Sequence, residues 1–90
     1  MTINEWYFIN EKNKIMAELT KIATFLTTQQ EKLRDEVTTR EEVFDDKSET
    51  YQESDKGSDY EMKTEALEEL IELIYEVEEK IGKIKEGDYY

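Results

Sequence analysis

Apolar residues recur at helical spacing along the first half of the chain. A row that stays on one face of a helix runs from Ile15 to Tyr51. Its 36-residue span matches ten turns of 3.6 residues. The row consists of Ile15, Leu19, Ile22, Leu26, Leu33, Val37, Phe44 and Tyr51. Thr2 and Glu5 have the spacing of a capping box, so we expect one long helix over residues 3–50.

This first row is weaker in its second half, where Gln30, Arg40 and Ser48 dilute it. Segment 24–28, Thr-Phe-Leu-Thr-Thr, has modest helix propensity, and a bend would fall there. Fraying is expected at residues 45–48, because Asp and Ser side chains compete for backbone hydrogen bonds.

The second helix has two candidate starts. Ser58 and Glu61 form another capping box, in which case Gly57 is free to close the first helix in the left-handed conformation. Alternatively, the helix begins at Ser54 and includes Gly57 in its first turn. We adopt the first reading and expect a helix over residues 58–85.

A heptad row predicts the buried face of this second helix. It consists of Leu67, Leu70, Ile74, Val77, Ile81 and Ile84, widened by Ala66, Ile71 and Leu73. Gly87 can end the helix, and residues 86–90 are expected to be a frayed tail.

These two helices predict an all-α fold, a single domain over residues 1–90 built as a long antiparallel hairpin. The first helix is the longer one, so its N-terminal apolar residues would have no partner within the chain. We therefore expect self-association into a dimer or a larger helical bundle; the alternative is that the first helix breaks and folds back. The expected contact residues are Trp6, Phe8, Ile15, Leu19 and Ile22.

Charge is concentrated in one segment. Residues 41–79 hold 16 acidic and 3 basic residues, a net charge of −13, and would form an acidic prong of the hairpin. Residues 1–40 are neutral with 6 of each, and residues 80–90 carry +1, which gives the total of −12. This polarity is typical of an interaction protein.

One face of the second helix carries a continuous acidic stripe, expected opposite the Leu67, Ile74 and Ile81 face. The stripe consists of Glu61, Glu65, Glu68, Glu72, Glu76 and Glu79. Packed as a hairpin about 30 Å long, segment 41–79 would carry about one carboxylate per 2 Å, close to the one charge per about 1.7 Å of duplex DNA. Such density opposes folding, so the stripe is either a partner-binding surface or a device for solubility alone.

The composition excludes several kinds of chemistry. Without Cys or His, the chain has no disulfide, no thiolate metal site and no acyl-transfer dyad, and we expect no catalytic residues, metal or cofactor. Paired carboxylates such as Glu41/Asp45 lie on solvated faces without a cleft between them. The longest apolar run, residues 6–9, is far too short to span a membrane. We expect a cytoplasmic protein, and its acidity argues against direct binding to nucleic acid or anionic lipid.

Residues 44–57, followed by an acidic helix, resemble a group of short acidic bacteriophage proteins. The shared segment is Ser-Glu-x-aromatic-Gln-Glu-Ser-acid-basic-Gly, with Tyr51 at the aromatic position. The resemblance covers roughly residues 40–80 and implies a phage or mobile-element setting, within the host cytoplasm. It implies no activity and no functional residues.

Taken together, these observations predict a non-enzymatic protein-binding module. Its specific form would be an inhibitor that mimics nucleic acid and occupies the basic groove of a host nucleic-acid-binding protein. The alternative is a structural or assembly protein of a phage particle, whose function is self-association.

Overall fold

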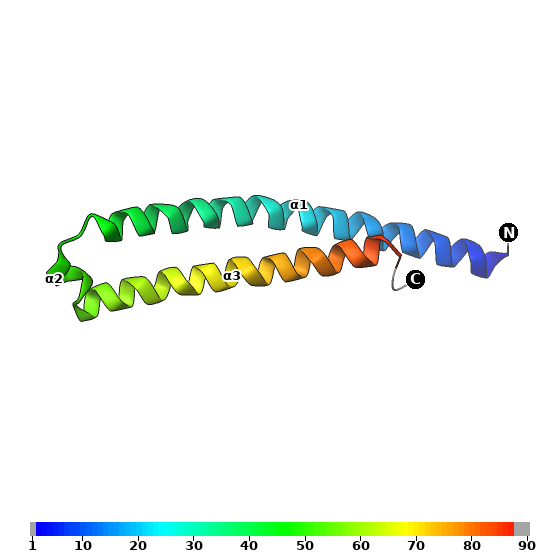
Figure 1. Ribbon diagram of the computed structural model, residues 1–90. Coiled ribbons are helices and arrows are strands. Elements are labelled where there is room, and N and C mark those ends of the chain that lie inside the picture. Colours follow the sequence, from blue (N-terminus) through cyan, green and yellow to red (C-terminus); the bar gives the residue numbers. More distant parts are fainter. Residues whose placement is uncertain (1, 88–90) are drawn as a thin grey trace.

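A computed structural model describes residues 2–87. It contains α1 (Ile3–Asp45), α2 (Glu49–Gln52) and α3 (Asp55–Lys85), and no strand within those residues. Figure 1 shows α1 and α3 side by side and antiparallel, joined at one end by α2. The rod measures 72 × 17 × 16 Å. The predicted all-α helical hairpin is therefore confirmed.

The helix α1 is unbroken from its predicted start. Thr2 Oγ1 accepts from the Glu5 amide and Glu5 Oε2 accepts from the Thr2 amide, both at 3.1 Å, so the capping box is present. No break occurs at segment 24–28, where threonine hydroxyls donate to the carbonyl four residues earlier, as Thr24 does to Thr20 at 2.9 Å. The alternative in which the first helix folds back is excluded.

The end of α1 at Asp45 corrects the expected end near residue 50. The chain instead makes a separate short helix, α2, for which Ser48 is the N-cap and accepts from the Tyr51 amide at 3.2 Å. The Gln52 amide reaches back to the carbonyl oxygens of Phe44 (3.0 Å) and Lys47 (3.1 Å). The Phe44 carbonyl belongs to the last turn of α1 and the Lys47 carbonyl to the turn that follows, so Gln52 adds hydrogen bonds at a helix end and stabilises the turn.

The helix α3 begins earlier than expected. Its N-cap is Ser54, whose hydroxyl accepts from the Gly57 amide at 3.1 Å, so the start at Ser58 is wrong and the alternative start is right. Gly57 lies inside α3 and not in the left-handed conformation. A Cβ there would overlap the carbonyl oxygen of Tyr51 and lie 2.8 Å from that of Gln52. Glycine is thus required by the close approach of α2 to α3.

The far end of α3 agrees with expectation. The helix ends at Lys85, and Gly87 takes the left-handed conformation with φ of 91°. Of the predicted frayed tail, Glu86 is the C-cap of α3, and residues 88–90 lie outside the described residues.

The seam between α1 and α3 follows alternating steps of three and four residues. On α1 it comprises Leu19, Ala23, Leu26, Gln30, Leu33, Val37, Arg40 and Phe44; on α3 it comprises Gly57, Tyr60, Thr64, Leu67, Ile71, Ile74, Glu78 and Ile81. Three predicted seam residues lie outside it. Ile84 falls beyond the last seam position, Ile81. Leu70 and Val77 are exposed, at 42% and 47%. Ile71 and Glu78, their next neighbours in sequence, occupy the seam instead.

The core of the hairpin is thin. Its buried apolar side chains are Val37, Ile71, Ile74 and Ile81, and no side chain in residues 2–87 is completely buried. Two polar atoms in the seam, Gln30 Nε2 and Glu78 Oε1, are buried without a hydrogen-bond partner among the described residues. The seam thus supplies little apolar burial and also carries a desolvation cost.

Candidate protein-interaction surfaces

A stacked column of aromatic rings and cations organises the closed end of the hairpin. The Arg40 guanidinium lies 3.9 Å from the centroid of the Tyr60 ring, and Phe44 stacks on Tyr60 at 6.1 Å. Arg40 Nε donates to Thr64 Oγ1 at 2.9 Å, and Nη2 donates to the Tyr60 carbonyl at 3.0 Å. Tyr51 of α2 lies 6.5 Å from Phe44. These contacts fix the register of α1 on α3.

A groove of about 400 Å³ lies over this column. Its lining includes the carboxylates Glu41 and Asp45 of α1 and Glu61, Glu65 and Glu68 of α3, together with Arg40, Phe44, Tyr60 and Thr64. Five carboxylates from two helices therefore surround one guanidinium that is already hydrogen-bonded within the hairpin. The groove has an acidic rim and an aromatic interior.

The carboxylates of this groove are close enough to perturb one another. Partial desolvation, a hydrogen bond with Glu41, and the negative charges of Glu41, Glu65 and Glu72 all raise the pKa of Glu68. A raised pKa means that the surroundings disfavour the charged form of the carboxyl group. The folded chain thus holds negative charge here against repulsion.

The surface on either side of the seam forms two flanks of the hairpin, and a residue's position next to a seam residue in the sequence decides which flank it joins. Glu68 follows the seam residue Leu67, Glu41 follows Arg40, and the two interact across the helices. Arg34 follows Leu33, and its guanidinium lies 4.8 Å from the ring centroid of Tyr75, which follows Ile74. Residues that follow a seam residue therefore share one flank, and those that precede a seam residue share the other.

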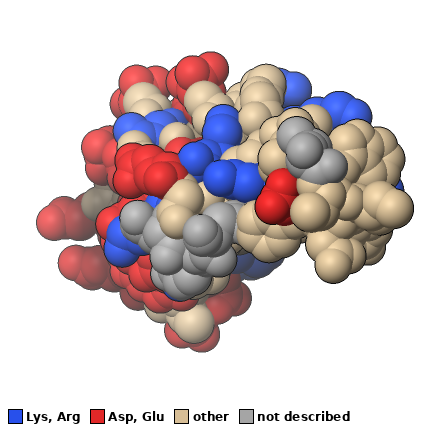
Figure 2. Space-filling model, turned by 90° about the vertical axis from the view of Figure 1, so that its right-hand side faces the viewer, with Lys and Arg blue, Asp and Glu red and all other residues tan. Residues whose placement is uncertain are grey.

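The first flank is strongly acidic. Of its charged positions, eight are carboxylates and one is Arg34. The carboxylates of this acidic flank are Glu31, Glu41, Asp45, Glu61, Glu65, Glu68, Glu72 and Glu79. Figure 2 looks along the rod from its open end and shows carboxylates gathered on one side of this view, beside the largely uncharged N-terminal part of α1 that projects toward the viewer.

The predicted acidic stripe is thus brought together, but its placement needs correction. All six glutamates are exposed, yet five of them lie beside the seam on the acidic flank, and Glu76 alone points toward the outer face. Residues 55–79 of α3 rise about 37 Å at about 1.5 Å per residue. The prong then carries about one carboxylate per 2.3 Å, still comparable with duplex DNA.

The second flank is apolar in its middle third. Its exposed apolar side chains come from both long helices: Ile22 (46% exposed), Phe25 (62%), Leu70 (42%), Leu73 (56%) and Val77 (47%). Each of these residues immediately precedes a seam residue. We call this set the apolar flank.

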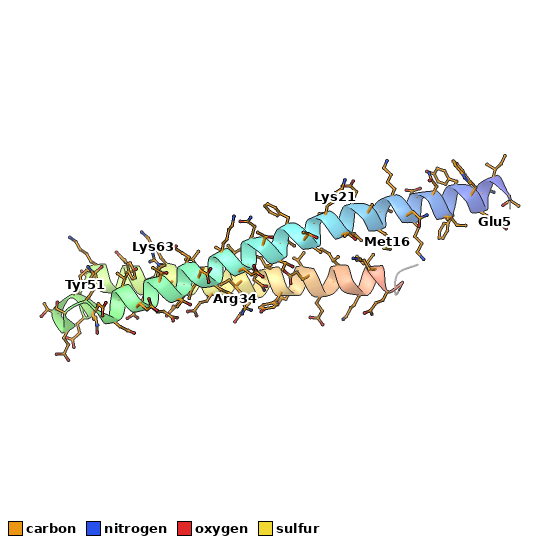
Figure 3. All side chains as sticks on the ribbon, turned by 90° about the horizontal axis from the view of Figure 1, so that it is seen from above. Glu5, Met16, Lys21, Arg34, Tyr51 and Lys63 are labelled. Atoms are coloured by element: carbon orange, nitrogen blue, oxygen red, sulfur yellow. The ribbon has the colours of Figure 1, made fainter. Side chains whose placement is uncertain are left out.

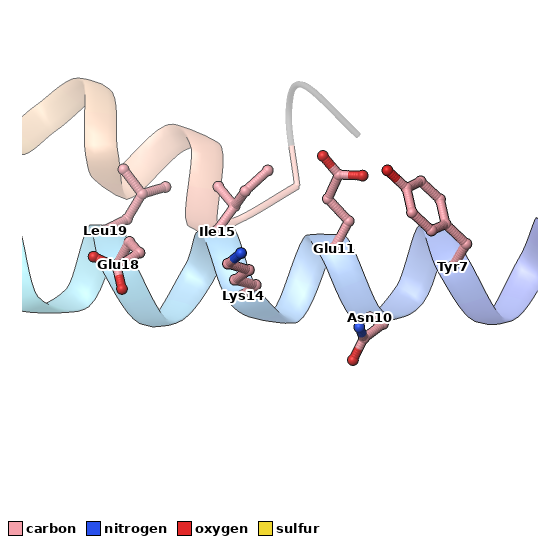
Figure 4. Close-up of a pocket in the computed structure, with 7 residues that line it drawn as sticks. All are labelled: Tyr7, Asn10, Glu11, Lys14, Ile15, Glu18 and Leu19. Carbon is pink, nitrogen blue, oxygen red and sulfur yellow. The ribbon is translucent and has the colours of Figure 1, made fainter.

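Residues 3–18 of α1 extend past the last turn of α3, and we call them the N-terminal overhang. Figure 3 shows this part of α1 from above, with Glu5 labelled near its end. Among the predicted contact residues, Trp6 and Phe8 are each 58% exposed. Ile15 and Leu19 are only half-buried, and Figure 4 shows both pointing toward the end of α3. The expectation that Ile15 and Leu19 have no partner within the chain is therefore wrong, because α3 extends further along α1 than expected.

A second groove of about 400 Å³ follows the overhang where α3 ends. It is lined by Tyr7, Asn10, Glu11, Lys14, Ile15, Glu18 and Leu19. A hydrogen bond with Glu11 and its negative charge raise the pKa of the Tyr7 hydroxyl. The groove is open to solvent.

Sequence reasoning missed Arg40, Tyr60 and Glu41 as parts of one site. Arg40 was recognised only as a polar interruption of an apolar row. Arg40 and Phe44 are successive seam positions of α1, and both face Tyr60. That they belong to one site can be recognised only when the register of α1 on α3 is known. Phe25 was missed because it lies outside the apolar row of α1.

Within residues 2–87, no group of three or more carboxylates is arranged to hold a metal ion. Over the same residues, neither long helix has a stretch sufficiently apolar to cross a bilayer. No family model, no curated protein and no solved structure matches the chain.

Proposed function

We propose that this protein is a non-enzymatic binding module whose acidic flank occupies the basic, nucleic-acid-binding groove of another protein. In a phage or mobile-element setting, it would inhibit a host protein by displacing its nucleic acid. The observation that carries this proposal is the convergence of eight carboxylates from α1 and α3 on one flank, against a single arginine.

The raised pKa of Glu68 supports a binding role for this flank. A surface needed only for solubility is best served by dispersed charge, whereas Glu41 and Glu68 face each other from different helices. A partner cation placed between them would relieve their repulsion. Binding of a basic surface would therefore be favoured, because it removes the repulsion between these two carboxylates.

The groove over Arg40 offers a place for one such cation. Its five carboxylates can accept hydrogen bonds from a lysine or arginine of the partner, and the Phe44 and Tyr60 rings offer apolar contact for the side-chain stem. We expect this closed end of the hairpin to be the centre of the contact.

The test is capture of host proteins on the immobilised chain, followed by identification of what is retained. The quadruple variant Glu61→Lys, Glu65→Lys, Glu68→Lys and Glu72→Lys should lose the partner while keeping its helicity, because all four side chains are exposed and lie on the acidic flank. A control with equal charge change, Glu18→Lys, Asp35→Lys, Glu69→Lys and Glu86→Lys, should retain it, since these exposed residues lie off the acidic flank. Equal capture by both variants would refute the proposal.

A second candidate function is structural: assembly of a phage particle through the N-terminal overhang. The exposed Trp6 and Phe8 favour it, because aromatic side chains anchor protein interfaces. In that case Trp6→Ala would abolish binding to a virion component, whereas the quadruple charge reversal would leave it intact.

A further inference from the structure

We infer that the apolar flank is the contact surface for a second copy of this chain, so that two hairpins pack face to face as a four-helix bundle. This inference concerns the side of the rod away from the acidic flank and is independent of the proposed function. It also shifts the expected self-association surface from the overhang to the body of the hairpin.

The apolar flank has the extent of a helix-packing face. Its members lie on both helices, and Ile22, Phe25, Leu70, Leu73 and Val77 are each between 42% and 62% exposed. Arg40 of α1 is hydrogen-bonded to Thr64 of α3, so six residues further along the antiparallel pair Leu70 lies level with about residue 34 of α1. From that level to Ile22 the stripe extends over about 12 residues, or about 18 Å. Contiguous exposed apolar surface on two adjacent helices marks an interaction site.

Charge on this flank suits an identical partner. The positions that precede seam residues hold three acidic and four basic side chains, in contrast to eight and one on the acidic flank. They are Glu18, Glu36 and Asp59, and Lys32, Lys56, Lys63 and Lys80. Each flank has a net charge of only +1, so two apolar flanks can meet with little repulsion, and the pairing directs both acidic flanks outward, away from each other.

The thin core explains why the partner is a second copy. Only four apolar side chains are buried within the described hairpin, and none is buried completely. A domain of this size needs further apolar burial to be stable. A second copy is the one partner present whenever the chain folds, and a four-helix arrangement buries the exposed rows of both hairpins.

Light scattering over a range of micromolar concentrations tests the assembly. The wild-type chain should have the mass of two copies, and Leu73→Glu should reduce it to the mass of one. The matched control is Tyr75→Glu, an apolar residue of similar exposure (45% against 56%) on the acidic flank, which should leave the dimer intact. A monomeric wild-type chain overturns the inference, as does a dimer that survives Leu73→Glu.

Cysteine cross-linking keeps the test decisive if Leu73→Glu fails to fold. The chain has no cysteine, so single Cys residues report on one surface each. A short bis-maleimide should link copies through Phe25→Cys or Leu73→Cys, and at least tenfold less through Glu72→Cys on the acidic flank. Stronger linkage through Trp6→Cys in the overhang than through either flank position would overturn the inference.

Discussion

Replacing Gly57 by alanine tests whether the close approach of α2 to α3 determines the turn. Gly57 lies in the first turn of α3 with ordinary helical geometry, so alanine would by itself favour the helix by about 1 kcal/mol. However, its Cβ would overlap the Tyr51 carbonyl oxygen and lie 2.8 Å from that of Gln52. Both obstacles are backbone atoms of α2, so the short helix must shift.

The structure supplies a matched control in Gly82. This residue also lies inside α3, and a Cβ there would meet nothing within 4 Å. Adding a methyl group to a closely packed site costs about 1–3 kcal/mol beyond any helix gain. We therefore expect Gly57→Ala to lower the free energy of unfolding by about 2 kcal/mol, and Gly82→Ala to raise it by about 1 kcal/mol.

Thermal unfolding followed by circular dichroism, at one protein concentration, measures both effects. For a chain of this length each kcal/mol shifts the melting temperature by about 4–8 °C. Gly57→Ala should melt about 8–16 °C below the wild type, and Gly82→Ala about 4–8 °C above it. If Gly57→Ala melts at or above the wild-type temperature, the contact between α2 and α3 does not constrain this position.

Three further predictions concern polar groups. Gln30→Leu should raise the free energy of unfolding in urea by about 1–3 kcal/mol, since it removes a buried amide without a partner; a loss of stability would show that Gln30 is satisfied in solution. Glu68→Gln should raise the melting temperature at pH 7, and the gain should shrink as the pH falls. The folded-state pKa of Glu68 is raised, so ionisation opposes folding and this cost disappears once the pH is below both pKa values; a gain that grows in acid would contradict this. The wild-type melting temperature should rise from low salt to about 0.15 M, where the Debye length is about 8 Å, and a flat response would mean that the carboxylates do not oppose folding.

The helical hairpin was predictable because the apolar periodicity of both long helices is strong. The capping signals at Thr2 and Gly87 placed two helix ends correctly. The turn was less predictable, because Ser54 and Ser58 both satisfy the rules for an N-cap. Only the tertiary contact of Gly57 with α2 distinguishes them, and this contact is not encoded in local spacing.

The seam of α3 could not be placed because two apolar rows run side by side. Leu70 and Val77 belong to one row, and Ile71 belongs to the other, in which Glu78 occupies the next seam position. A carboxylate at that position made the true seam look less apolar than the exposed row. The same misplacement hid the α3 part of the apolar flank, since Leu70, Leu73 and Val77 were assigned to the core.

Segment 48–57, from which the phage setting was predicted, has a structural explanation at most of its positions. Ser48 and Ser54 cap α2 and α3, Gln52 holds the end of α1, and Gly57 permits the close approach. Tyr51 packs near Phe44. These residues therefore build the turn, and recognition is proposed to lie on the acidic flank beside it.

The most direct test of that proposal is a competition measurement with the captured partner. The fluorescence anisotropy of labelled duplex DNA or RNA bound to the partner is followed as this protein is added. The wild-type chain should displace the nucleic acid, with an apparent affinity that falls steeply as ionic strength rises. The variant with Glu61, Glu65, Glu68 and Glu72 reversed to Lys should not displace it. If that variant competes as well as the wild type, the acidic flank does not mimic nucleic acid.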